Sequence, residues 1–169
     1  HEKLFVAAPG QAPRLAFPMD AGVYTSLSVA QDAPVLVARW ESAISPAEVV
    51  RIDPAKGHTA LSAFNAERVA QLDWRPVEHF TFTHDGRSIH NMIVKPANFD
   101  PAQKYPLFVM IHGGPHTMWR DQFFLRWNYH LIATGSAASD PAAAKDGFVL
   151  LLTNYKGSTG FGEKFAQAI

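Results

Sequence analysis

Cysteine is absent from this 169-residue sequence, and its absence excludes disulfide bonds, thiolate metal sites and cysteine nucleophiles together. An excess of charge of either sign is also missing, because 15 Lys and Arg residues balance 15 Asp and Glu residues. Without a positive field or a basic run, we expect no nucleic-acid partner. The sequence has no apolar run of about 18 residues either, so it predicts no membrane-spanning helix.

What the sequence does contain is the composition of globular protein. Its hydrophobic fraction is 47% and its charged fraction is 18%, which is typical of chains that bury a core. The length allows one domain or parts of two. The sequence starts at His1 without a leader pattern, and we expect the natural N-terminus to be missing. The compartment, cytoplasmic or periplasmic and secreted, therefore stays open.

Residues 1–73 are predicted to be rich in β-strands. Short runs of β-branched and aromatic residues alternate there with turn residues such as Pro9-Gly10. The predicted strands are Lys3–Ala8, Val23–Val29, Pro34–Trp40, Val49–Ile52 and Thr59–Phe64. Because no helical segment separates them, they favour a meander, either blades of a β-propeller or a sandwich. No internal repeat decides between the two.

Residues 74–169 have a different pattern of apolar and polar residues, which predicts a hairpin followed by an α/β sheet. Asp85-Gly86 separates the β-rich runs Glu78–Thr83 and Ser88–Val94, a strong hairpin signal. Leu107–Ile111 and Phe148–Leu152 are unbroken apolar runs. Unbroken apolar strands are typical of central strands covered on both faces, as in α/β folds.

The sequence between these two apolar runs predicts a helix over Met118–Thr134. Large apolar residues at helical spacing would turn one face of it towards the core; they are Trp119, Phe123, Trp127 and Leu131. Base stacking is the less favoured alternative for the aromatic residues in this segment, because the surface is not basic; they are Trp119, Phe123, Phe124 and Trp127. The small residues Ala137–Asp146 predict a surface loop.

The motif His112-Gly113-Gly114-Pro115 directly follows the first unbroken apolar strand. Paired glycines at a strand end leave backbone amides free to approach a substrate oxygen closely. Acyl transfer needs such donors where negative charge grows on the carbonyl oxygen, and His-Gly-Gly sequences supply them in lipases and esterases. A plain Gly-Gly-Pro turn that closes the strand is an equal alternative from this motif alone.

Nucleotide and metal sites are poor interpretations of the remaining motifs. Gly157 and Gly162 have the spacing of a P-loop, but Glu163 stands where the lysine is needed and would repel phosphate. Histidine and glutamate side chains also lack a recognised metal spacing; those considered are His112 with His116, and Glu78 with His79 and His84. We therefore expect no cofactor and no metal.

The second informative motif is Asn154-Tyr155-Lys156-Gly157-Ser158-Thr159-Gly160-Phe161-Gly162, which follows the second apolar strand. In this sequence a strand ends in His-Gly-Gly-Pro, and the second motif follows one helix and one strand later. This arrangement resembles the prolyl oligopeptidase family. The resemblance is to its acylaminoacyl-peptidase and bacterial dipeptidyl-peptidase branches. It is specific over residues 76–165, and two mild departures occur: Lys156 replaces the usual Arg, and Phe161 replaces a common Tyr.

The resemblance implies that the chain is an internal fragment of a serine peptidase acting on short peptides. It places the last blades of a β-propeller in residues 1–73 and the start of an α/β-hydrolase domain in residues 74–169. His112, Gly113 and Gly114 would form the oxyanion-side loop. Tyr155, Lys156 and Gly157 would form a substrate-side loop. The implied partners are a short peptide and the remainder of the same catalytic domain, with homo-oligomers also compatible.

The nucleophile that such an enzyme needs is not found in this sequence. No serine has glycine both two positions before and two positions after it, so Gly-x-Ser-x-Gly is absent and no triad can be assigned. We expect the chain by itself to be inactive. The alternative is a non-catalytic hydrolase-like or β-rich binding module. A complete module should not leave the sheet edge at Phe148–Leu152 open.

Overall fold

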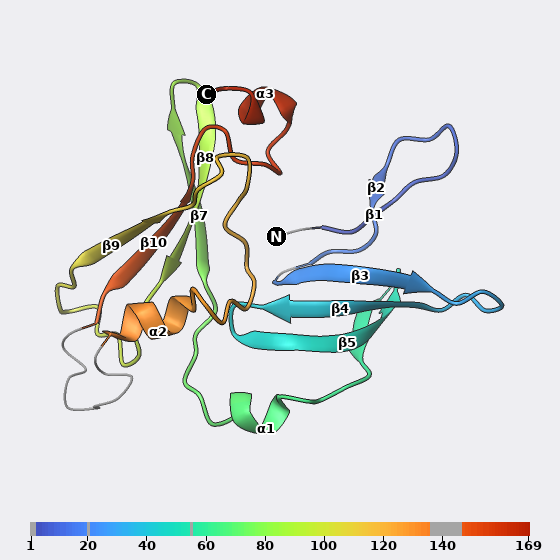
Figure 1. The fold of residues 1–169 in the computed structure, drawn as a ribbon, viewed down its shortest axis with the longest axis horizontal. Coiled ribbons are helices and arrows are strands. Elements are labelled where there is room, and N and C mark those ends of the chain that lie inside the picture. Colours follow the sequence, from blue (N-terminus) through green and yellow to red (C-terminus); the bar gives the residue numbers. More distant parts are fainter. Residues whose placement is uncertain (1–2, 20, 55, 136–146) are drawn as a thin grey trace. The chain divides into compact units, whose positions relative to one another are not determined.

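Consecutive β-rich runs of the first half pair with one another, as their spacing predicts. In the computed structural model, which describes residues 3–19, 21–54, 56–135 and 147–169, the chain divides into two units. The first comprises His1–Leu72 with Arg120–Phe123, and the second comprises Asp73–Trp119 with Phe124–Ile169. Figure 1 labels their helices and strands. We describe each unit by itself.

The first unit is built on a four-stranded antiparallel sheet in sequence order, with a separate short strand pair. The sheet contains β3 (Val23–Val29), β4 (Leu36–Ser42), β5 (Ser45–Asp53) and β6 (Gly57–Ala60). The short elements are β1 (Phe5–Val6), β2 (Arg14–Leu15) and α1 (Ala66–Val69). Tyr24 pairs with Trp40 across β3 and β4, and Ala38 pairs with Val50 across β4 and β5. The observed strand near the N-terminus is shorter than predicted, and β6 ends at Ala60 rather than Phe64.

The core of the first unit is a cluster of buried apolar side chains. Its members are Ala16, Phe17, Tyr24, Ala38, Val50 and Ile52. The Phe17 and Tyr24 rings meet edge to face with their centroids 5.9 Å apart. Burial of a side chain such as Phe17, Val50 or Ile52 stabilises a fold by roughly 1.5–3 kcal/mol. This sheet is therefore held by its own core.

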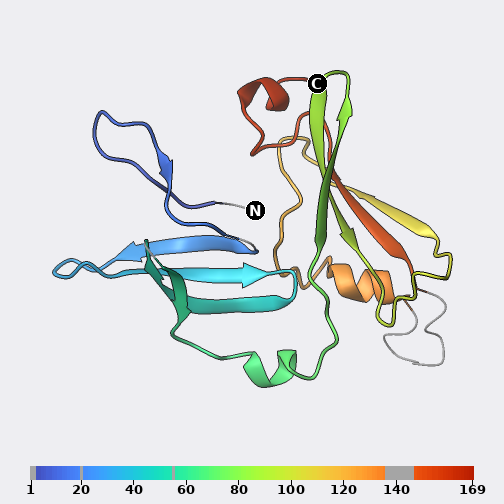
Figure 2. The same ribbon diagram turned by 180° about the vertical axis from the view of Figure 1, so that it is seen from behind.

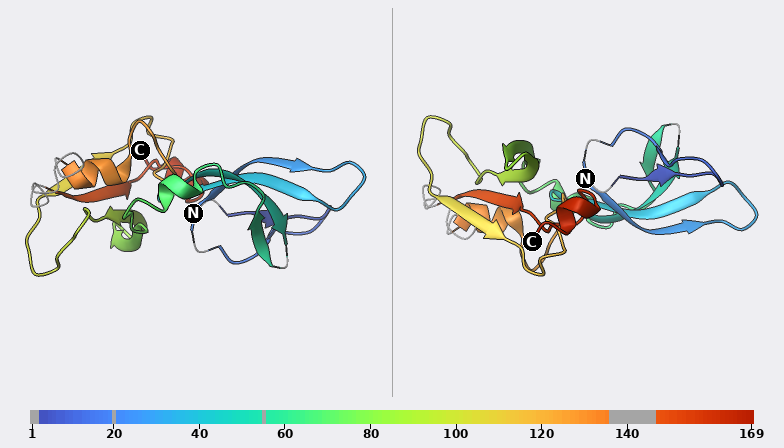
Figure 3. Two further views of the ribbon diagram at one scale, coloured as in Figure 1. Left: turned by 90° about the horizontal axis from the view of Figure 1, so that it is seen from below. Right: turned by 90° about the horizontal axis from the view of Figure 1, so that it is seen from above.

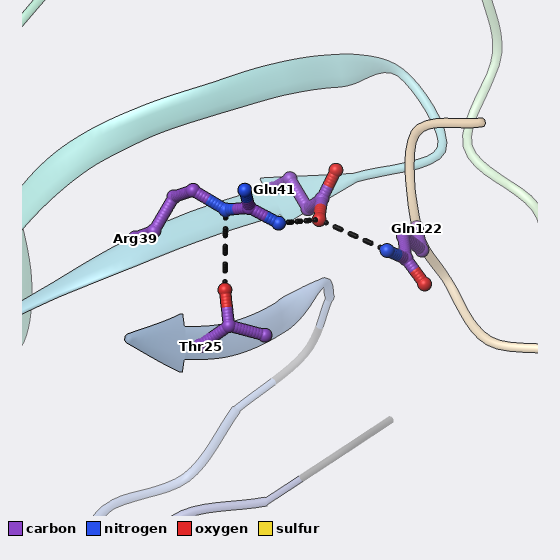
Figure 4. Close-up of polar contacts among 4 residues, drawn as sticks. All are labelled: Thr25, Arg39, Glu41 and Gln122. Carbon is purple, nitrogen blue, oxygen red and sulfur yellow. Dashed lines mark hydrogen bonds and ion pairs between the residues drawn. The ribbon is translucent and has the colours of Figure 1, made fainter. Parts of the chain in front are cut away.

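Four residues from the second half of the sequence belong to the first unit. Asp121 is buried, and its carboxylate accepts hydrogen bonds from the amides of Gly22 (2.7 Å) and Ala43 (2.8 Å). The adjacent Gln122 donates from Nε2 to Glu41 (3.1 Å), which also accepts from Arg39 (3.2 Å; Figure 4). Buried acceptors therefore attach the segment Arg120–Phe123 to the residue before β3, to β4 and to the turn after β4.

The second unit is a mixed sheet in the order β7-β8-β10-β9. Its strands are β7 (Glu78–His84), β8 (Arg87–Val94), β9 (Leu107–Ile111) and β10 (Val149–Asn154). The predicted hairpin is present: Asp85 and Gly86 have φ of 50° and 68°, the left-handed pair that a tight hairpin turn requires. β10 runs antiparallel to β8 and parallel to β9, and Figure 2 shows this order from behind.

The predicted helix over Met118–Thr134 is confirmed only in its last six residues. The helix α2 covers only Tyr129–Thr134 and contacts β8 and β10, where Figure 3 shows it in orange beside the sheet. Asn128 caps it by accepting a hydrogen bond from the amide of Leu131 (3.0 Å). Trp119 is buried as predicted, but Trp127 is 48% exposed and Leu131 is 54% exposed. Tertiary hydrogen bonds of residues 119–122 replace the helical ones that the apolar spacing predicted.

The two unbroken apolar strands differ in how far they are covered. In β10 buried and half-buried residues alternate, whereas four of the five β9 residues are exposed, from 45% for Phe108 to 69% for Ile111. The prediction that both strands are central is therefore wrong for β9, which is an edge of the described sheet. The open edge accordingly lies at β9 and not at Phe148–Leu152.

The short helix α3 (Glu163–Ala166) follows the second motif and buries Phe165. The loop predicted at Ala137–Asp146 lies outside the described residues. Within the described ranges, no helix is long and apolar enough to cross a membrane.

Candidate functional site

The two motifs leave the same edge of the second unit's sheet. Ile111, the last residue of β9, is paired with Thr153 near the end of the parallel strand β10. Because the carboxyl ends of parallel strands meet at one edge, the loops after them come together. The first loop, residues 112–119, and the second loop, residues 154–162, are therefore neighbours although their sequences are far apart.

His112 is buried, and both of its ring nitrogens have hydrogen-bond partners. Nε2 lies 2.8 Å from the Ser158 hydroxyl, and Nδ1 lies 3.3 Å from the Gly113 carbonyl oxygen. Since a carbonyl only accepts, Nδ1 carries the proton and Nε2 accepts from Ser158. Burial lowers the pKa of His112, which favours this neutral ring. The imidazole therefore faces into the protein.

The two glycines that follow His112 are exposed. A Cβ at Gly113 would meet no atom within 4 Å, so a ligand has room there. Gly114 has φ of 114°, a conformation that side-chain-bearing residues rarely adopt. Between described residues, neither amide donates a hydrogen bond. This loop thus presents two amide donors to solvent.

Tyr155 and Gly157 of the second loop hold the first loop in place. The Tyr155 hydroxyl donates to the His112 carbonyl oxygen, and the two rings stack with centroids 4.5 Å apart. His116 Nδ1 lies 3.1 Å from the Gly157 carbonyl oxygen. Lys156 points elsewhere: its Nζ lies 3.5 Å from the carboxylate of Asp85 in the hairpin turn. Two of the three predicted substrate-side residues therefore contact the first loop.

Asn154 and Ser158, which the sequence interpretation quoted without giving them a role, are also part of this site. Both are completely buried, and Asn154 forms hydrogen bonds with the backbone of Trp119. The sequence signal that could have identified Asn154 is its polarity at the end of an apolar strand. A buried Asn needs hydrogen-bond partners within the protein for its side-chain amide. The sequence alone could not say which backbone would supply them.

The two histidines of the first loop bond to other groups of the two loops. Within the described ranges, no group of three or more His, Asp or Glu side chains has the geometry of a metal site. His112 and His116 direct their nitrogens to Ser158 and to the Gly157 carbonyl oxygen, as described above.

Comparisons with known proteins agree with this architecture. No family model matches the chain. The probable dipeptidyl-peptidase 5 of Aspergillus terreus is 34% identical over 156 residues, covering 89% of this chain and 20% of that protein. The dipeptidyl-peptidase 5 of Porphyromonas endodontalis is 32% identical over 136 residues, covering 79% of this chain and 18% of that protein.

Among solved structures, Pyrococcus horikoshii acylaminoacyl peptidase has a similar fold. The TM-score is 0.72 at 21% identity, over 97% of this chain and 23% of that one. The fold is thus one found in peptidases. The chain belongs to the prolyl oligopeptidase family. It spans about one fifth of the length of the curated relatives named here.

Proposed function

We propose that the chain is part of a serine-type peptidase that hydrolyses short peptides by acyl transfer. The observation that carries the proposal is the pair of unbonded, exposed amides at Gly113 and Gly114, held on a buried and neutral His112. Negative charge develops on the scissile carbonyl oxygen during acyl transfer, and preorganised amides stabilise it. The names of the relatives make dipeptide release the first substrate class to test.

In this proposal the His112 imidazole positions the loop and the amides are the donors. A ring that gives its Nδ1 proton to the Gly113 carbonyl has no second proton for an oxyanion. The stacking partner Tyr155 and the hydroxyl of Ser158 keep the ring in this orientation. The donors are then backbone groups, which need no reorganisation as charge develops.

The proposal also assigns the two halves of the chain. Residues 1–73 are the end of a β-propeller, and residues 74–169 are the start of an α/β-hydrolase domain. Support comes from the antiparallel meander in the first unit and the parallel β9–β10 pair in the second. The exposed apolar side chains of β9 fit burial by the remainder of the same catalytic domain. That remainder supplies the nucleophile, so the 169-residue chain alone is inactive.

The test compares the complete enzyme with this chain on dipeptidyl, aminoacyl and acylaminoacyl anilides, together with a fluorophosphonate serine probe. We expect the complete enzyme to turn over at least one class and to be labelled, and the chain alone to do neither. If the complete protein is silent towards all of them, the peptidase proposal fails and a binding module takes its place.

Two variants of the complete enzyme test the loop itself. Gly113→Pro removes the amide hydrogen, whereas Gly113→Ala keeps it and has room for the added carbon. We expect kcat to fall by about 10²–10³-fold for Gly113→Pro and by less than about tenfold for Gly113→Ala. A Gly113→Pro enzyme that melts like the wild type and retains its kcat would rule out this amide as a donor.

A further inference from the structure

Asn154 uses all the hydrogen-bonding atoms of its side-chain amide. Its Oδ1 accepts from the amide of Trp119 at 2.7 Å, and its Nδ2 donates to the Trp119 carbonyl oxygen at 3.0 Å. The second Nδ2 hydrogen points to Nδ1 of His90, also at 3.0 Å. The side chain is completely buried. The side-chain amide of Asn154 thus bonds to both backbone groups of Trp119, in the way that the backbone of a paired strand does.

Trp119 is the residue at which the first loop ends. The loop starts at His112 after β9, and its glycines have a freer backbone than other residues. At its start it is held by Ser158 and Tyr155, and at its end by Asn154. A second bond near the end runs from the amide of Thr159 to the carbonyl oxygen of Thr117 (2.9 Å). The second loop therefore fixes both ends of the segment that carries the two open amides.

His90 sets the direction of the Asn154 amide. Its Nδ1 can accept from Asn154 only when unprotonated, which leaves the ring hydrogen on Nε2. That Nε2 lies 3.0 Å from Nδ1 of His79 on the neighbouring strand β7. Rotating the amide by half a turn would place its NH₂ group against the Trp119 amide, donor against donor. It would also place Oδ1 against the unprotonated Nδ1 of His90, acceptor against acceptor. His90 thus favours the one orientation that holds Trp119 by both backbone groups.

We propose that Asn154 is a positioning residue for the reaction, and that His90 acts through it by orienting its amide. The inference rests on the proposed function, because the loop that it positions is the oxyanion-side loop. Neither residue touches the substrate in this proposal. They keep Gly113 and Gly114 where the developing charge appears, and a displacement of about 1 Å there is enough to cost about 10²-fold in rate.

The first test replaces Asn154 in the complete enzyme. Asn154→Asp keeps the acceptor for the Trp119 amide but removes both donors, so it loses the Trp119 carbonyl and His90. We expect kcat for a dipeptidyl anilide to fall by about 10–100-fold, with KM changed by less than about threefold. The matched control is Asn128→Asp, another buried Asn, whose helix-capping role Asp fulfils equally well. It should keep the wild-type kcat.

The second test uses a pair of variants at His90. His90→Asn places an acceptor where Nδ1 was, whereas His90→Leu provides none, and both lose the ring stacking with His79. We expect His90→Asn to keep at least about half of the wild-type kcat and His90→Leu to lose about tenfold or more. A purely structural role for the ring would affect both variants equally. This pair decides the question if Asn154→Asp does not fold.

Hydrogen–deuterium exchange of the peptide covering residues 112–119 supplies a readout that does not depend on activity. Faster exchange there in Asn154→Asp and His90→Leu, but not in Asn128→Asp or His90→Asn, supports the positioning role. Unchanged exchange and kcat in Asn154→Asp, or equal losses in the two His90 variants, would overturn it. Absence of turnover by the wild type would instead contradict the proposed function, and the exchange data would still judge the positioning role.

Discussion

Single side chains in the two motifs act mainly on one another. His112 belongs to the predicted oxyanion-side loop, but its ring is buried against Tyr155 and bonded to Ser158. A buried imidazole with both nitrogens partnered stabilises the loop that contains it. At the scale of the residue, several side chains of these motifs therefore serve to hold the two loops together.

Removing the Tyr155 hydroxyl should weaken both stability and catalysis. Tyr155→Phe keeps the ring stacking but leaves the His112 carbonyl oxygen without this donor, which costs about 0.5–1.5 kcal/mol in the free energy of unfolding. We expect kcat to fall by about threefold to tenfold as the loop shifts. Calorimetry and steady-state kinetics on the complete enzyme measure the two effects.

The matched control for this prediction is Tyr105→Phe. The Tyr105 hydroxyl accepts a hydrogen bond from the amide of Asp100 at 2.9 Å in the connection before β9. Its loss should lower the melting temperature by a similar amount with kcat unchanged. Equal kcat losses in the two variants would show that the Tyr155 bond has no special effect on the loop.

At the scale of elements, the segment between β9 and β10 illustrates how tertiary contacts override a local pattern. Apolar residues at helical spacing predicted a helix from Met118, yet the helix begins only at Tyr129. The backbone N–H and C=O of Trp119 both bond to the Asn154 side chain, so they are not available for helical hydrogen bonds. The Asp121 carboxylate accepts from the amides of Gly22 and Ala43 and holds this segment in its place. The spacing rule sees only contacts within one element and cannot include partners tens of residues away.

Replacement of Asp121 should lower the stability of the protein more than most other substitutions in this segment. Asp121→Ala leaves the buried amides of Gly22 and Ala43 without this acceptor, at a cost of about 1–3 kcal/mol each. We expect a lower melting temperature of the complete protein and faster amide exchange at both positions. Asp100→Ala is the control, because Asp100 accepts from Ala102 (2.9 Å) at an exposed turn. A melting temperature no lower than that of the control would contradict the prediction.

At the scale of the whole molecule, the burial of histidine side chains makes the free energy of unfolding depend on pH. Burial lowers the pKa of His58 in the first unit and of His90 and His112 in the second. Each ring is therefore protonated more readily in the unfolded chain than in the folded one. The stability that these groups contribute is complete above their unfolded pKa of about 6.5 and is lost as the pH falls through their lower folded pKa.

This linkage predicts a measurable acid sensitivity. From about pH 7.5 to about pH 5 the melting temperature of the complete protein should fall, and His58→Asn should reduce that fall. Asparagine can still accept from the Tyr24 hydroxyl, which lies 2.5 Å from His58 Nδ1, but it does not titrate. Calorimetry at the two pH values measures the difference. An equal fall in the wild type and the variant would exclude His58 as a contributor.

The sequence by itself determined the local elements and the family. β-Branched runs, the Asp85-Gly86 turn and the two apolar strands depend on neighbours along the chain, so their patterns are visible without a structure. The His-Gly-Gly-Pro motif and the motif beginning at Asn154 likewise gave the prolyl oligopeptidase resemblance that the relatives confirm.

Only the tertiary structure decided which groups meet. The burial of His112 on Ser158, the pairing of Asn154 with Trp119 and the use of Asp121 as an acceptor all join residues at least 35 positions apart. The exposed position of β9 at the sheet edge likewise depends on strand order. Hydrogen bonds and burial depend on which groups are close in space. For residues far apart in the sequence, that closeness is set by the folded sheet and cannot be obtained from their order along the chain.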